Sequence, residues 1–132
     1  MSDANNPLSA LIQDDSVELD LELLTALLKD YVKLSKDGAI SPLRPFYDKD
    51  NQQKLLIMLL AYKAKNILFE GEAEGVAPSA LIATQIMAEG SVKSTLKHLL
   101  EKTHEIKKDT KGGYYIPAYL LPDIEKRLKS EG

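Results

Sequence analysis

Apolar residues recur at helical spacing in several stretches of this chain, and each stretch is bounded by residues that favour the start or end of a helix. The first covers residues 17–36, which contain leucines three and four residues apart. Asp15 with Glu18 suits a capping box before this stretch. Gly38 suits its end, because glycine adopts the left-handed conformation without a steric penalty. We therefore expect an N-terminal helix here.

A second, longer stretch predicts the central helix of the fold. The preceding linker, residues 39–48, contains two prolines and is expected to be extended. Asp50 and Gln53 form another capping pair, and residues Gln52–Phe69 follow as a helix that is apolar on almost all sides in its first half. A helix without a polar face is contacted from several sides, so we expect the rest of the domain to pack around it.

Two shorter helices are predicted next. Pro78 suits a helix start, because its missing N–H is not needed there, and Ser79–Met87 follows. Gly90 is expected to break the pattern and Ser91 to cap a helix over Val92–Lys102. At about 100° per residue this last helix has an apolar side and a polar, mainly basic side. The apolar side is formed by Val92, Leu96, Leu99 and Leu100, and the polar side by Lys93, Ser94, Lys97, His98 and Glu101.

The remaining residues predict a β-hairpin and a C-terminal helix. Residues 104–117 read as two short strands joined by the sequence DTKGG, whose glycines tolerate positive φ. Because neighbouring strand residues face opposite ways, we expect one of Tyr114 and Tyr115 to pack on the core and the other to point outward. Residues 121–130 form an amphipathic helix. The pattern as a whole predicts a mainly α protein with a small β-hairpin.

Composition narrows the class of protein. A length of 132 residues with 44% apolar and 28% charged residues favours one globular domain, with residues 1–14 as a flexible N-terminus and 15–132 as the domain. There is no cysteine, which excludes disulfides and thiolate metal sites. No secretory signal is recognised, and the longest apolar run has seven residues, far short of a membrane span. We expect a soluble, cytoplasmic protein.

The charge is unevenly distributed along the chain. Residues 1–90 contain eight basic and fourteen acidic residues, a net charge of −6, whereas residues 91–132 contain nine basic and six acidic residues, a net charge of +3. Such an asymmetry can mark an interaction surface for an anion such as nucleic acid. The excess of +3 is smaller than in many dedicated DNA-binding domains.

The order of elements from Gly75 to Pro117 resembles the winged helix-turn-helix superfamily of DNA-binding proteins. In this resemblance Gln52–Phe69 is the first helix, "APSALIATQIM" the second, "SVKSTLKHLLEK" the recognition helix and "HEIKKDTKGGYYIP" the wing. It implies a winged-helix core over residues 50–118, with additional helices over 15–38 and 121–130. Three features depart from the common pattern: Thr103–His104 stands where a glycine often precedes the wing, the recognition helix has no arginine, and the turn before that helix contains the acidic Glu89.

The resemblance implies that the recognition helix enters the major groove of double-stranded DNA while the wing contacts the backbone. Lysine side chains donate to guanine edges or phosphates, and hydroxyl groups donate to either. The same lysines have a simpler explanation as the solvated surface of a small domain. A winged helix used for protein–protein contact, as an adaptor or complex subunit, is the alternative function. The DNA-facing residues implied are Ser91, Lys93, Ser94, Lys97, His98, Lys107, Lys108, Thr110 and Lys111.

Other chemistries find little support in the sequence. There is no phosphate-binding loop, nucleophile elbow or HExxH motif, so we expect neither an enzyme nor a cofactor. His98 and His104 lie six residues apart without metal-ligand spacing, and we expect them at the surface. The leucine stripes of the two end helices either pack on their own domain or pair between subunits. Because palindromic DNA sites are bound by two-fold symmetric proteins, we expect a homodimeric transcriptional regulator.

Overall fold

The computed structural model of the chain describes residues 19–69 and 73–129. It is mainly helical with two short antiparallel strand pairs, which confirms the predicted class of a mainly α protein with a small β-hairpin. Two 3₁₀ helices lie at Arg44–Asp48 and Ala118–Leu120. The other elements, in chain order, are α1 (Leu21–Leu28), β1 (Val32–Leu34), β2 (Ile40–Pro42), α2 (Asn51–Leu68), α3 (Pro78–Ala83), α4 (Glu89–Glu101), β3 (Lys107–Lys108), β4 (Tyr114–Tyr115) and α5 (Leu121–Lys129).

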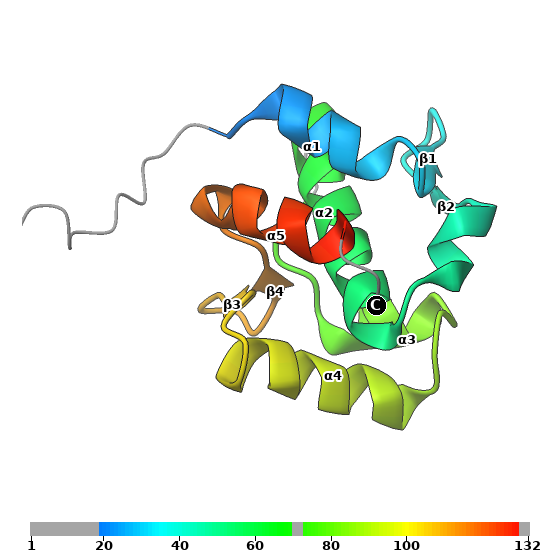
Figure 1. Cartoon of the computed structure of the whole chain (residues 1–132). Helices are drawn as coiled ribbons and strands as arrows, with labels where there is room; N and C mark the ends of the chain where they lie inside the picture. The colour runs from blue at the N-terminus through cyan, green and yellow to red at the C-terminus, as the bar shows by residue number, and fades with distance from the viewer. Residues whose placement is uncertain (1–18, 70–72, 130–132) are drawn as a thin grey trace, which may run out of the picture.

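Helix α2 is the centre of the fold, as its all-round apolar sequence predicted. Every residue from Leu55 to Ala61 is buried, and the helix contacts α1, α4, α5 and β4 (Figure 1). The predicted capping box begins the helix: Asp50 Oδ1 accepts from the Gln53 amide at 2.8 Å, and Gln53 Oε1 accepts from the Asp50 amide at 3.3 Å. These two bonds satisfy amide groups that have no partner within the helix.

The N-terminal helix is shorter than the sequence suggested. Helix α1 ends at Leu28, and the residues expected to continue it to position 36 instead form the hairpin of β1 and β2. Gly38, with φ of +89°, lies in the turn of this hairpin and does not end a helix. The Asp37–Gly38 pair between apolar residues is a known hairpin signal, and it prevails here over the helical spacing. The expected Asp15–Glu18 capping box and the expected N-terminus over 1–14 lie outside the described residues.

The connection between α3 and α4 also differs from the prediction. Helix α3 ends at Ala83, before the expected Met87, and Gln85 adopts a positive φ of 60° in the connection. Helix α4 already begins at Glu89, so Gly90 lies in its first turn and does not interrupt it. Its N-cap is Ala88, which offers no side-chain oxygen, and Ser91 is therefore not the cap. The early start places the acidic Glu89 beside the positive end of the helix dipole.

The predicted hairpin forms from β3 and β4, and a third segment supports it. Lys107 pairs with Tyr115 and Lys108 with Tyr114. Val76, just before α3, forms an isolated bridge with Tyr114 through two backbone hydrogen bonds of 2.8 and 2.9 Å. This bridge fixes β4 beside the start of the α3–α4 unit.

The leucine stripes of the two end helices pack within the chain. Leu24, Leu27 and Leu28 of α1 are buried, and so are the three apolar residues of the α5 stripe, Leu121, Ile124 and Leu128. Helix α5 contacts both α1 and α2. Of the two arrangements considered for these stripes, packing on their own domain is therefore the one observed.

Candidate nucleic-acid interface

Helix α4 divides into a buried and an exposed side. Val92, Leu96 and Leu99 are buried as predicted, Leu100 is only half-buried, and Thr95 joins the buried side. Contacts with α2 and α3 cover this side of the helix. The burial pattern fixes the rotation of α4 about its axis, and with it the direction of the polar side chains.

The opposite side of α4 presents four of the predicted DNA-facing residues to solvent. Lys93, Ser94, Lys97 and His98 are exposed, and positions i, i+1, i+4 and i+5 of a helix share one face. Ser91 is half-buried, so it lies at the edge of this face. We call Lys93, Ser94, Lys97 and His98 the α4 face.

Acidic residues flank the α4 face. The Lys93 ammonium forms an ion pair with the carboxylate of Glu89, four residues earlier, at an Nζ–Oε2 distance of 3.2 Å. Both side chains are largely exposed. Glu101 is exposed at the other end of the helix. Such a surface pair is weak, so the Lys93 ammonium remains available to a stronger anionic partner.

The end of α4 is set by a residue in an unusual backbone conformation. His104 adopts φ of 57°, the left-handed region that glycine enters most easily. The Thr103 and Glu105 amides donate to the His98 and Leu99 carbonyls at 3.1 and 2.9 Å, so the chain turns sharply from α4 into the hairpin.

Three predicted residues are exposed at the hairpin: Lys108, Thr110 and Lys111. We call them the wing tip. The carboxylate of Asp109 shapes it, because its Oδ1 accepts from the amides of Lys111 at 2.9 Å and Gly113 at 2.8 Å. The Lys108 ammonium lies 5.6 Å from the centre of the Tyr114 ring. A compact loop with two outward lysines suits contact with phosphate groups.

The two tyrosines of β4 differ in their surroundings, but they do not separate into one core residue and one outward residue as predicted. Both are half-buried. Tyr114 packs against the hydrophobic core, whereas Tyr115 lines a polar pocket. They thus lie in different environments, but neither is fully outward.

Lys107 lies apart from the other predicted lysines. It is half-buried, and its ammonium lies 5.3 Å from the centre of the Tyr119 ring. It lines the same pocket of about 320 Å³ as Tyr115. The buried Lys63 and its ion-pair partner Glu74, a pair that the sequence did not reveal, line this pocket too. The position of Lys63 four residues after Leu59 was the signal available in the sequence, since that spacing places it on a buried side.

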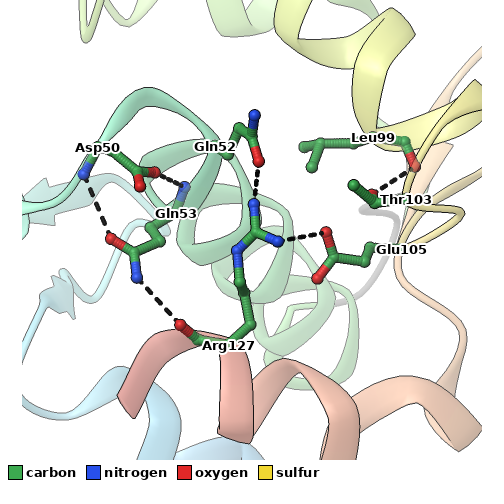
Figure 2. Close-up of polar contacts among 7 residues, drawn as sticks. All are labelled: Asp50, Gln52, Gln53, Leu99, Thr103, Glu105 and Arg127. Atoms are coloured by element: carbon green, nitrogen blue, oxygen red, sulfur yellow. Dashed lines mark hydrogen bonds and ion pairs between the residues drawn. The ribbon is translucent and has the colours of Figure 1, made fainter. Parts of the chain in front are cut away.

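Polar contacts between α2, α5 and the loop before β3 hold the base of the β3–β4 hairpin, as Figure 2 shows. Arg127 of α5 lies between the Glu105 carboxylate, 3.3 Å from its Nη1, and the Gln52 side-chain carbonyl, to which its Nη2 donates. Gln53 donates to the Arg127 carbonyl at 3.0 Å, which satisfies an otherwise open carbonyl near the end of α5. Glu105 is largely buried, so the guanidinium supplies the positive charge that its burial requires.

The histidines and acidic residues form no metal centre in the part of the chain that the structure describes. His98 and His104 are both exposed, as predicted. Across residues 19–69 and 73–129, no three or more histidine, cysteine, aspartate or glutamate side chains gather closely enough to bind a metal ion. Within the same residues, no helix combines the length and apolar character needed to cross a bilayer.

Comparison with known proteins adds no family to this picture. No protein-family model, no curated protein sequence and no solved structure matches the chain.

Proposed function

We propose that the protein binds double-stranded DNA as a winged helix-turn-helix protein, with α4 in the major groove and the β3–β4 hairpin as the wing. The observation that carries this proposal is that the α4 face and the wing tip belong to adjoining elements and both expose lysines. Helix α4 leads directly into the hairpin through the turn at His104. In Figure 1, α4 lies at the opposite end of the molecule from α1, with α5 between them.

The chemistry of these surfaces suits a polyanion. Lys97 and Lys93 can donate to phosphates or to guanine O6 and N7, and Ser94 can donate to either. Lys108 and Lys111 are placed to contact phosphates beside the groove. With lysine as the only strongly basic residue type on these surfaces, affinity would come mainly from phosphate contacts and would be sensitive to salt.

In this proposal the protein acts as a small transcriptional regulator in the cytoplasm. The homodimer expected from the sequence stays a prediction. The leucine stripes of the end helices, which led to this expectation, are buried within one chain. A dimer interface must therefore be formed by other surface residues. Two-fold symmetry would still be required to place two copies of α4 about one DNA turn apart.

A protein-binding module is the second candidate, and one observation favours it. The α4 face lies between Glu89 and Glu101, and Lys93 already pairs with Glu89. A face with both signs of charge suits a protein partner with complementary charges. The two candidates differ sharply in how they respond to free DNA.

The test is a fluorescence anisotropy titration of mixed genomic DNA fragments at about 50 and about 200 mM salt, where phosphate binding weakens steeply. We expect binding at the lower salt, and its loss in the double variant Lys97→Glu with Lys108→Glu. The matched control is Lys36→Glu with Lys126→Glu, which makes the same charge change at exposed lysines outside α4 and the β3–β4 hairpin. Absence of binding by the unchanged protein, or equal losses in both variants, would refute the proposed interface.

A further inference from the structure

An apolar groove lies on the side of the molecule formed by α1, β1 and the C-terminal end of α2. Three large apolar side chains at this groove are unusually exposed: Leu21 at 56%, Ile67 at 45% and Leu68 at 67%. The groove has a volume of about 320 Å³. Its walls are mostly aliphatic and are completed by Leu24, Leu28, Val32, Leu34 and Ala64. Contiguous exposed apolar surface of this kind is a common mark of a docking site.

Among the described residues that line the groove, the charged side chains are basic. Lys29 and Lys33 are both exposed and line it, and no aspartate or glutamate of residues 19–69 and 73–129 does. A segment that docks here should therefore be apolar on one side and acidic nearby.

The chain itself contains such a segment in its first 18 residues, which lie outside the described part of the structure. Leu8, Leu11 and Ile12 are spaced so that a helical turn would place them on one side. Residues 1–18 contain four acidic and no basic residues, and three of the acids, Asp14, Asp15 and Glu18, follow the apolar group closely. The segment thus has both properties that the groove requires.

The connection is long enough for this segment to reach the groove of its own chain. Ile12 precedes Leu21, itself a groove residue, by nine residues, and nine residues span up to about 30 Å. The eight residues of α1 are only about 12 Å long, so the segment can fold back along the whole groove. Tethering also gives it a local concentration in the millimolar range, well above that of a separate molecule.

From these observations we propose that residues 8–18 bind the apolar groove of their own chain, with Leu8, Leu11 and Ile12 against Leu21, Ile67 and Leu68, and the acidic residues beside Lys29 and Lys33. This proposal does not depend on DNA binding, because the groove shares no residue with the α4 face or the wing tip. It gives the N-terminal segment a role as a cover for apolar surface.

A disulfide trap tests the proposal directly, since the natural chain has no cysteine. In the full chain, Leu11→Cys with Leu68→Cys should form an intramolecular disulfide under mild oxidation, because docking brings the two Cα atoms within about 7 Å. The matched control is Leu11→Cys with Thr110→Cys, whose second position is an exposed residue of the wing tip. We expect the groove pair to react roughly tenfold faster than this control at the same protein concentration.

Non-reducing electrophoresis separates the outcomes. A fast disulfide in a monomer band supports docking within the chain. A disulfide mainly in a dimer band would overturn it in favour of the groove of a second copy, and a rate equal to that of the wing-tip control would overturn docking altogether.

A charge exchange tests the polar part of the same proposal. In the trap variant, Lys29→Glu with Lys33→Glu should slow disulfide formation, and adding Asp14→Lys with Asp15→Lys should restore it. Both effects should shrink at about 1 M salt, where exposed charges are screened beyond about 3 Å. Slowing without restoration would show that the acidic residues do not meet these lysines.

Discussion

The support of the hairpin by Val76 can be tested with one added methyl group, in Gly113→Ala. Gly113 is buried at the base of the wing, directly before Tyr114. A Cβ at this position would lie 2.8 Å from the carbonyl carbon of Gly75 and 3.0 Å from its Cα. Both are backbone atoms next to Val76, so the substitution must push the Val76 segment away from β4.

The expected decrease in the free energy of unfolding follows from the hydrogen bonds that this movement breaks. Val76 and Tyr114 exchange two backbone hydrogen bonds, of 2.8 and 2.9 Å. A net contribution of about 0.5–1.5 kcal/mol for each gives a loss of about 1–3 kcal/mol in the free energy of unfolding. Val76 is also buried, so its displacement disturbs the core beside α3.

Two other glycines provide matched controls with different expected results. Gly112 has φ of +86°, but an added Cβ meets only the end of the Lys108 side chain, at 3.9 Å. Gly112→Ala should therefore cost about 1 kcal/mol through backbone strain alone, with the bridge intact. Gly90, in the first turn of α4, has no atom within 4 Å of an added Cβ. Gly90→Ala should stabilise the protein by about 0.4–1 kcal/mol, because it restricts the unfolded chain.

Urea denaturation gives the three stability changes, and amide hydrogen exchange reports on the bridge itself. Gly113→Ala should accelerate exchange at Val76 and Tyr114, whereas Gly112→Ala should leave these two amides protected. The reasoning is refuted if Gly113→Ala leaves their protection unchanged, or if Gly90→Ala destabilises the protein more than Gly112→Ala does.

Three further predictions concern other parts of the structure. Ala88→Ser should stabilise the protein by about 1 kcal/mol in urea denaturation, because serine can cap the open amides at the start of α4. Arg127→Met should destabilise it by about 1–3 kcal/mol in the same assay, because the largely buried Glu105 loses its positive partner; an unchanged midpoint would contradict this. The Ser35 hydroxyl and the backbone hold the pKa of Asp37 below the ordinary value, so its stabilising effect should be complete above pH 4 or so and be lost as the pH falls through the lowered pKa. An NMR titration of Asp37, repeated in Ser35→Ala, should show the lowered pKa move upward.

Most of the helices could be predicted because their signals are local and agree with one another. The apolar run of α2 and the Asp50–Gln53 capping box both indicate a helix that begins near position 51 and is central to the fold. The amphipathic pattern of α4 likewise predicted the burial of Val92, Leu96 and Leu99 and the exposure of its lysines. In α2, propensity, capping and burial all favour the same structure, whereas in α4 the apolar spacing alone was a reliable guide.

The errors arose where two local signals compete. Residues 30–36 fit helical spacing, but the turn that contains Asp37 and Gly38 allows residues 32–34 to pair with residues 40–42. At α4, Gly90 resembled a helix end, yet glycine is tolerated in a first turn and the helix begins before it. A single sequence does not reveal which signal prevails, because tertiary packing decides it.

The candidate site could be predicted only in part from the sequence, because some of its residues depend on distant contacts. Lys107 looked equivalent to Lys108, yet it turns toward a pocket formed with Lys63 and Tyr119. Two contacts join positions far apart in the chain: the ion pair of Arg127 with Glu105 and the backbone bridge of Val76 with Tyr114. Helical and strand periodicity report on neighbouring residues and contain no information on such pairs.

The most direct test of DNA binding by α4 and the hairpin is the salt dependence of affinity. If Lys93, Lys97, Lys108 and Lys111 each neutralise one phosphate, the slope of log K against log salt should be about −3.6, roughly a 150-fold loss between about 50 and 200 mM salt. The neutral variant Lys97→Ala with Lys108→Ala should retain weaker binding and reduce the slope to about −1.8, while the control Lys36→Ala with Lys126→Ala should leave it near −3.6. A slope unchanged by the first variant, or no binding at about 50 mM salt, would contradict the account.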